Sequence, residues 1–442
     1  MVIVLALVAV AVLAVVAGLH WYVWRRLVRD TTRGPGPARR VGTVLFVAGP
    51  VLMVAALVTE RSGAPFWLQR TLAWPGFLWM VLALYLLLAV LVGEAVRPLL
   101  RRPLHRRRQP SANPVEPPLS RPSENPVGSL LGRPSRVVAE RSPGYQGAEP
   151  PGTATAALDT REVPDTEEPT RRLFVSRVVA GAAATAAAAT VGYGTYGVLR
   201  GPRVKHVTVP LAKLPRAAHG FRVAVVSDIH LGPILGRDFA QKVVDTVNAT
   251  QPDLIAVVGD LVDGSVKDLG PAAAPLARLR ARHGAYFVTG NHEYFSGAEQ
   301  WVAEVRALGL HPLENARTEL PYFDLAGVND LQGESEGHGP DFGKALGDRD
   351  TARACVLLAH QPVQIHEAVR YGVDLQLSGH THGGQLWPGN LLAAAANPTV
   401  AGLDRYGDTQ LYVTRGAGAW GPPTRVGAPS DVTVIELAAT RA

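Results

Sequence analysis

Residues 222–230 read RVAVVSDIH, and residues 253–263 repeat the same pattern as DLIAVVGDLVD. In both stretches a short apolar run rich in β-branched residues ends in polar side chains. Three further runs of this kind follow: AYFVTGNHE at 285–293, ACVLLAH at 354–360 and VDLQLSGHTH at 373–382. Runs of this length and composition are typical of buried strands, and helical stretches at 238–249 and 298–308 lie between some of them. The pattern therefore predicts an α/β domain.

Polar residues gather directly after these strands, where functional residues of α/β folds usually lie. They are Asp228, His230, Asp260, Asp263, Asn291, His292, Glu293, His360, His380 and His382. In an extended segment residues i and i+2 point the same way, so Asp228 with His230, and His380 with His382, can each converge on one point. A single pair would be weak evidence, but the shared position at five strand ends predicts a common site.

The donor types of this set indicate a metal centre. Imidazole nitrogen with carboxylate and amide oxygen suits divalent or trivalent Mn, Fe or Zn, and the absence of thiolates argues against a soft-metal site. The set holds too many donors for one tetrahedral ion, so two ions sharing a carboxylate fit better. Two metals about 3.5–4 Å apart are typical of phosphoester hydrolysis. Two divalent ions, two aspartates and a bridging hydroxide leave a net positive charge, which favours an anionic phosphoester.

The five clusters resemble, in order and residue type, the signature of the calcineurin-like metallophosphoesterases over residues 206–437. The GGQ at 383–385, the RGAG at 415–418 and the PTR at 423–425 are similar to the membrane-linked bacterial branch of the YkuE and YaeI kind. The resemblance implies two mixed β-sheets packed between helices, a four-layer αββα sandwich with metals at the carboxyl ends of strands. One departure is Ser430-Asp431, near where the branch often has Pro-Glu.

The resemblance also implies a role for each residue. Asp228, His230 and His382 would hold the first metal, Asp260 would bridge, and Asn291, His360 and His380 would hold the second. His292 would contact the phosphoryl group and protonate or stabilise the leaving oxygen, and Asp263 would orient His292. Glu293 fits the usual acidic position of the family, with a solvated surface charge as its alternative interpretation.

Residues 1–100 form the first part of an apolar N-terminal half. Apolar runs at 2–24, 41–59 and 73–96 have a length suited to the hydrocarbon core of about 30 Å. The first run lacks the basic start of a signal peptide and is followed by more apolar runs, so we expect it to span. Six arginines lie in 25–40 and six in 97–108, against two between the second and third runs. This bias predicts three transmembrane helices with the N-terminus outside.

Residues 101–170 have a different composition, with 13 prolines between residues 103 and 170 and little apolar clustering. They are expected to form a disordered cytoplasmic linker. At 171–200, Arg171-Arg172-Leu173-Phe174 precedes an uncharged, Ala-rich run and resembles an internal twin-arginine export signal. A fourth crossing there would carry the metallophosphoesterase domain, 201–442, out of the cytoplasm. A soluble Ala-rich helix is the alternative, and cleavage near 184–188 is left open.

Composition excludes other classes of protein. Cys355 is the only cysteine, which excludes an intramolecular disulfide and a Cys-rich zinc module. Residues 1–204 hold 24 Arg and Lys against 12 Asp and Glu, whereas residues 205–442 hold 20 against 25. The basic excess thus lies with the apolar segments and not on the folded domain, so no nucleic-acid partner is expected.

These features lead to one hypothesis and two alternatives. We expect a multi-pass protein of the cell membrane whose extracytoplasmic domain hydrolyses phosphodiesters or phosphomonoesters, of envelope lipids or wall polymers, by attack of a metal-bridging hydroxide. A cytoplasmic-facing cyclic-nucleotide phosphodiesterase is the first alternative. A non-catalytic membrane scaffold is the second, which the complete ligand set disfavours. The oligomeric state is left open.

Overall fold

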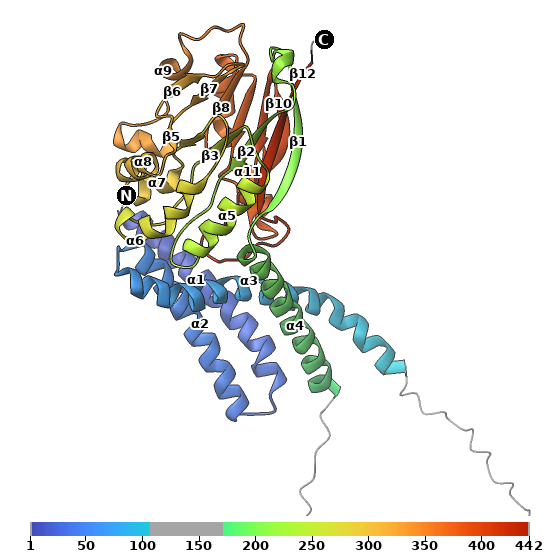
Figure 1. Ribbon diagram of the computed structural model, residues 1–442. Coiled ribbons are helices and arrows are strands. Elements are labelled where there is room, and N and C mark those ends of the chain that lie inside the picture. Colours follow the sequence, from blue (N-terminus) through green and yellow to red (C-terminus); the bar gives the residue numbers. More distant parts are fainter. Residues whose placement is uncertain (1, 107–170, 441–442) are drawn as a thin grey trace, which may run out of the picture.

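The computed structural model describes residues 2–106 and 171–440 (Figure 1). Most of the expected linker, residues 107–170, lies outside the described residues. The C-terminal part is built on two six-stranded sheets, and four long helices gather on one side of it.

The first sheet has the strand order β1-β12-β2-β3-β4-β5. Its strands are β1 (Arg203–Leu211), β12 (Asp431–Ala439), β2 (Phe221–Val226), β3 (Leu254–Val258), β4 (Ala285–Val288) and β5 (His311–Pro312). All neighbours run parallel except β12 and β2, which are antiparallel. Because β2, β3 and β4 are parallel, their carboxyl ends meet at one edge of the sheet.

The second sheet has the order β10-β11-β9-β8-β7-β6. Its strands are β6 (Ala316–Glu319), β7 (Asp324–Gly327), β8 (Cys355–Leu358), β9 (Leu375–Ser378), β10 (Gly402–Tyr406) and β11 (Thr409–Val413). The four central strands are parallel and the two edge strands antiparallel. The five strands expected from the sequence are thus all present, as β2, β3, β4, β8 and β9.

Alternate residues of these strands fill different layers of the core. Val223 and Val225 of β2 face Val356 and Leu358 of β8 in the layer between the sheets. The outer face of the first sheet is covered by α5 (Arg237–Ala249), α6 (Val266–Ala273) and α8 (Ala298–Ala307). The outer face of the second is covered by α9 (Phe342–Leu346) and α10 (Ile365–Arg370). The expected four-layer αββα sandwich is therefore confirmed.

The N-terminal helices are α1 (Val2–Leu27), α2 (Pro37–Arg61), α3 (Phe66–Arg106) and α4 (Arg171–Leu199). Within the described residues, four stretches are long and apolar enough to cross a membrane: Val10–Thr31, Pro37–Arg61, Phe66–Val96 and Leu173–Leu199. Helix α3 extends six residues into the range expected for the linker. Proline removes one helical hydrogen bond without having to end the helix, so Pro98 and Pro103 are accommodated.

Contacts between these helices divide their ends into two groups. At one end, Arg26 of α1 pairs with Glu94 of α3 at 3.2 Å, and Arg177 of α4 donates to the carbonyl of Thr31 at 3.0 Å. At the other end, Phe66 and Leu199 line the same cavity beside α5 and α6. The arginine-rich loop after α1 and the start of α4 thus lie at the same end of the helical bundle. The turn after α2 and the end of α4 lie together at the opposite end.

Helix α4 joins the first sheet almost directly. Only residues 200–202 separate its last residue from β1, and Gly201 takes a φ of 97°, which a side chain would disfavour. Lys242 of α5 donates to the carbonyl of Leu199 at 2.6 Å. The end of the helix is therefore fixed to the two-sheet domain as well as continuous with it.

Candidate metal centre

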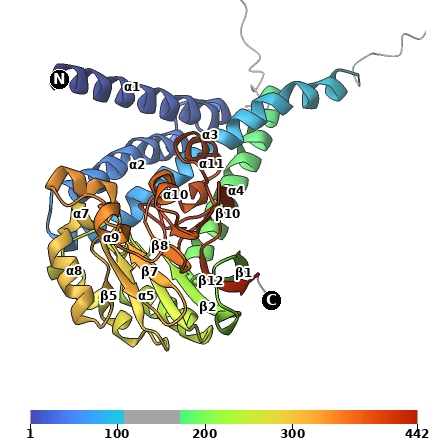
Figure 2. The ribbon, with the colours of Figure 1, turned by 90° about the horizontal axis from the view of Figure 1, so that it is seen from above.

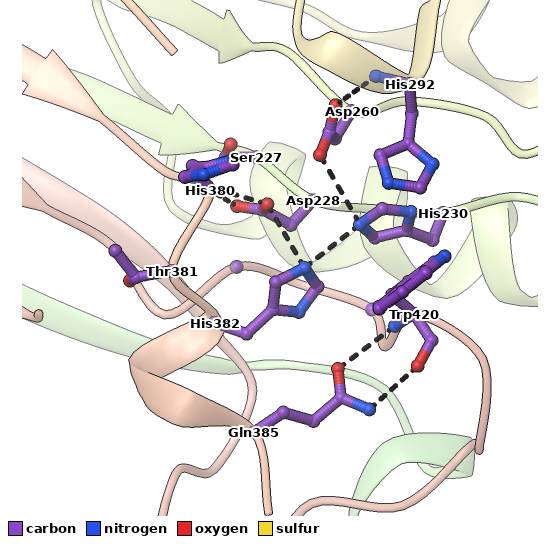
Figure 3. Close-up of polar contacts among 12 residues, drawn as sticks. Ser227, Asp228, His230, Asp260, His292, His380, Thr381, His382, Gln385 and Trp420 are labelled. Atoms are coloured by element: carbon purple, nitrogen blue, oxygen red, sulfur yellow. Dashed lines mark hydrogen bonds and ion pairs between the residues drawn. The ribbon is translucent and has the colours of Figure 1, made fainter. Parts of the chain in front are cut away.

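The site residues expected from the sequence lie together where the two sheets meet. The first sheet supplies Asp228 and His230 after β2, Asp260 and Asp263 after β3, and Asn291 and His292 after β4. The second sheet supplies His360 after β8, and His380 and His382 after β9. Figure 3 shows His230 between Asp260 and His382, so side chains from both sheets point to a common centre.

The backbone of this centre is strained. Five of the residues that carry its side chains have positive φ angles: Asp228 (52°), His230 (49°), Asp260 (52°), His380 (72°) and His382 (53°). Each such residue costs about 1–3 kcal/mol and is typically found at a functional site. Close packing adds to the constraint, since a Cβ at Gly379 would collide with Ser227 and Asp228. The surrounding fold holds these turns in conformations that the local backbone would not favour.

The first group of donors consists of Asp228, His230 and His382, whose ligand atoms all lie within 4.8 Å of one another. The Nε2 atoms of the two histidines are 3.0 Å apart, and His382 Nε2 lies 3.3 Å from Asp228 Oδ1. His230 Nδ1 donates to Asp263 Oδ1 at 2.9 Å, so the lone pair of its neutral ring lies on Nε2. Three donors aimed at one point fit a metal ion.

The second group consists of Asp260, His360 and His380. His360 Nδ1 donates to the carbonyl of Val258 at 2.8 Å, which leaves the lone pair on Nε2. That Nε2 atom is buried, has no hydrogen-bond partner among the described residues, and lies 3.1 Å from Asp260 Oδ2. Asn291 Oδ1 lies 3.0 Å from His380 Nδ1. A buried nitrogen that lacks a partner beside a carboxylate is what a bound ion would satisfy, so these residues fit a second metal.

Burial and charge set the protonation of the cluster. Burial raises the pKa of Asp228, and the neighbouring Asp260 carboxylate adds to this effect. For Asp260 burial acts in the same direction, but His360 and His230 outweigh it and lower its pKa well below the ordinary value. Burial lowers the pKa of His380 to about 4. His380 is therefore neutral near pH 7, the state in which imidazole binds a metal.

Asp263 connects His230 with His292. Its Oδ1 atom accepts from His230 Nδ1 at 2.9 Å and lies 2.7 Å from His292 Nδ1. Burial opposes ionisation, but the two histidines prevail and lower the pKa of Asp263 to about 2. Burial likewise opposes the charge on His292, yet Asp263 raises the pKa of His292 to about 9. The arrangement keeps a protonated imidazole beside the metal ligands.

Glu293 is fully buried and is not the solvated charge considered from the sequence. Its carboxylate accepts from the backbone N–H groups of Asp260, Leu261 and Gly290 at 2.9, 2.7 and 2.6 Å. It thereby fixes the turn that carries Asp260 against the turn that begins α7 (Asn291–Ser296). The bond from the Gly290 N–H is half of a capping box, because glycine has no side chain to supply the other half.

Arg425 performs a similar task for the second sheet, and sequence reasoning gave it no role. Its buried guanidinium donates to the carbonyls of His382 at 3.0 Å, Gly418 at 2.6 Å and Ala428 at 3.2 Å. Burial lowers the pKa of Arg425 to about 10. Arg425 thus links the loop that carries His382 to the C-terminal segment that contains the PTR motif, residues 423–425.

Two features at the rim of the centre were also missed. Gln385 exchanges hydrogen bonds with the backbone of Trp420, at 2.9 and 3.1 Å, and the Trp420 ring lies edge-on to His292 (Figure 3). Glu60, near the end of α2, interacts electrostatically with Asp263 and His292. The helical region therefore places a carboxylate near the centre, which depends on contacts that no local sequence pattern reveals.

Comparisons with known proteins point to the family that the sequence motifs resemble. The family model for the calcineurin-like phosphoesterases matches residues 221–384. A "Transmembrane protein with metallophosphoesterase domain" from Danio rerio is 40% identical over 259 residues, which cover 55% of this chain and 59% of that protein. The alignment thus spans less than two-thirds of the fish protein's length.

Two bacterial relatives are covered more fully. An "Uncharacterized metallophosphoesterase" from Helicobacter pylori is 37% identical over 56% of this chain and 68% of its own length. The "Uncharacterized metallophosphoesterase YkuE" from Bacillus subtilis is 30% identical over 61% of this chain and 98% of its own length. The similarity therefore extends over nearly the whole of a relative from the branch that the closing motifs resemble.

Proposed function

Because the chain belongs to the calcineurin-like metallophosphoesterase family, we propose that it is a membrane-tethered hydrolase of phosphodiesters or phosphomonoesters that uses two metal ions. The observation that carries this proposal is the buried Nε2 atom of His360. It has no hydrogen-bond partner in the described part of the chain and lies 3.1 Å from Asp260 Oδ2, where both sheets converge.

Each donor group would hold one ion. Asp228, His230 and His382 would bind the first, Asn291, His360 and His380 the second, and Asp260 would bridge. Nitrogen and oxygen donors without sulfur suit Mn, Fe or Zn. When bound, the ions supply Lewis acidity and activate water for attack on phosphorus.

His292 would act on the leaving group. Asp263 holds its Nδ1 at 2.7 Å and stabilises the protonated ring, which leaves Nε2–H to donate to the leaving oxygen. The backbone N–H of His292 donates to Asp260 Oδ1 at 2.9 Å, so the acid is fixed to the proposed bridging carboxylate. Asp263 is thus a positioning residue that acts through His292.

The membrane helices support a substrate of the cell envelope, such as a lipid head group or a wall polymer. Their arginine distribution and the Arg171-Arg172 motif support an extracytoplasmic domain at 201–442, with 171–200 as the export signal and 101–170 as a cytoplasmic linker. Protease added to intact cells should then cleave the domain. Full protection on intact cells, lost on lysis, would instead place it in the cytoplasm.

Metal-dependent hydrolysis by the purified full chain tests the proposal. Protein in detergent is stripped of metal, resupplied with manganese, zinc or iron, and assayed with chromogenic phosphodiester and monoester substrates beside Asn291→Ala. We expect turnover that requires metal and is lost in the variant. Turnover that persists without metal, or is equal in the variant, would refute the proposed centre.

A further inference from the structure

The segment that follows the last metal-ligand pair is unusually apolar for a surface. Residues 383–403 contain no charged side chain, although acidic residues outnumber Arg and Lys in the catalytic half. The segment includes α11 (Gly389–Ala396), a helix without a buried residue. Leu391 is 65% exposed, Leu392 77% and Trp387 53%. Clustered exposure of large apolar side chains indicates a surface that is covered by something else.

The surroundings of this segment identify what covers it. The hydroxyl of Tyr85 in α3 donates to the carbonyl of Trp387 at 2.9 Å. Leu386 and Val426, which are joined by a β-bridge, pack against the apolar cluster formed by α3 and α4. Both helices are candidate membrane spans, and in the view of Figure 2 α11 overlaps α3. The exposed apolar surface is therefore continuous with helices that themselves require a bilayer.

A groove between the two spans extends this continuity. It has a volume of about 570 Å³ and is lined by apolar residues of α3 and α4, with Trp387 and Val426 also lining it. The catalytic domain thus contributes side chains to a surface that is otherwise made by spanning helices. Tryptophan, like tyrosine, is enriched at the boundary between hydrocarbon and water. The exposed Leu391 and Leu392 of the helix beside it are side chains of the kind that an interfacial helix buries there.

We propose that Trp387 and α11 are immersed in the interfacial layer of the bilayer that α3 and α4 cross. The catalytic domain then has a membrane contact of its own, in addition to its tether. This contact follows His382 by only a few residues, so it fixes the height of the strand-end centre above the lipid head groups. The inference concerns position alone and holds whether or not the centre proves to be hydrolytic.

Site-specific fluorescence in nanodiscs tests this contact on the full chain. Cys355 is fully buried, so a single Leu392→Cys substitution directs an environment-sensitive probe to α11. The matched control is Ala303→Cys, an exposed alanine of α8. We expect spin-labelled lipids to quench the probe at 392 strongly and aqueous iodide to quench it weakly, with the opposite result at 303. Strong iodide quenching and absent lipid quenching at both positions would overturn the proposal.

A second substitution tests the apolar character directly. Adding Leu391→Glu to the Leu392→Cys chain should abolish lipid quenching and admit iodide, whereas Leu391→Ile should change neither. Because Leu391 is mostly exposed, both variants should unfold at the same temperature as the parent. A probe at 392 that is shielded from iodide but insensitive to spin-labelled lipid would show that a protein partner covers α11, and would equally overturn the proposal.

Discussion

The two sheets contribute different chemistry to one centre. The carboxylates of the cluster, Asp228 and Asp260, both follow strands of the first sheet, as does the amide of Asn291. The second sheet contributes only imidazoles, among them His380, whose pKa burial lowers. Negative charge that attracts ions therefore comes from one side, and neutral donors that complete the coordination come from the other. In the proposed arrangement each ion has ligands from both sheets, so it would also link them.

The supporting contacts differ in the same way. On the first sheet, the buried carboxyl group of Glu293 accepts from three backbone N–H groups. On the second, the cationic Arg425 donates to three backbone carbonyls. Each sheet thus anchors its turns with one buried side chain, an acid that accepts hydrogen bonds on the first sheet and a base that donates them on the second. If the first sheet supplies the charge and the second the neutral donors, substitutions on the two sheets should reduce activity to different extents.

The largest effect is expected where charge is removed from the first sheet. Asp260→Ala deletes the proposed bridging carboxylate and should lower kcat/KM for a phosphodiester by at least about 10³-fold. His380→Ala removes one neutral donor and should cost less, because both carboxylates remain. Metal content and steady-state rates measured on the two full-length variants provide the check. Equal losses would mean that charge does not distinguish the sheets.

Substitution of the proposed acid should separate catalysis from metal binding. His292→Gln keeps a polar side chain but cannot donate a proton, so kcat should fall by about 10²–10³-fold while metal content stays unchanged. The loss should be greater for an alkyl leaving group than for nitrophenol, which departs without protonation. A loss independent of the leaving group would contradict the role of His292.

Metal removal should weaken the contact between the sheets. If each ion binds both sheets only in the folded state, saturation at 100 times Kd adds about 2.7 kcal/mol per ion to the free energy of unfolding. Chelation should therefore lower the thermal midpoint of the catalytic domain, and Asn291→Ala should show a smaller decrease than the wild type. An identical midpoint with and without bound metal would show that the ions do not stabilise the contact between the sheets.

The smallest expected effect concerns pH. Asp263 raises the pKa of His292 to about 9, so the proton is held at neutral pH and is lost as pH rises through that value. In Asp263→Asn this support is absent, and the alkaline limb of kcat should move down by about one pH unit or more. The acidic limb should move little. A pH–rate profile of the metal-loaded variant with an unshifted alkaline limb would argue against Asp263 as the orienting group.

Local sequence was enough to locate the residues of the cluster, because each lies directly after an apolar run that forms a central strand. It was not enough for β1 and β12, which pair with each other across more than 200 residues of chain. Short strands such as β5, with two residues, carry no readable pattern. The roles of Glu293 and Arg425 depend on burial by distant segments, and that of Glu60 on the packing of helices against the domain. Residues whose role is indicated by adjacent residues in the sequence could be predicted. Residues whose role depends on distant parts of the fold could not.

The three-residue junction between α4 and β1 limits how far the centre can reach. Even fully extended, residues 200–202 cover only about 10 Å, and the contact of Lys242 with Leu199 shortens the free length further. The domain cannot swing far outward to collect substrate. If the substrate is a membrane lipid, as proposed, encounters come from lateral diffusion within the plane of the membrane. Its turnover should accordingly follow the surface density of substrate rather than its bulk concentration. Phosphoesters held in distant layers of a wall would be out of range, whatever their affinity for the metals.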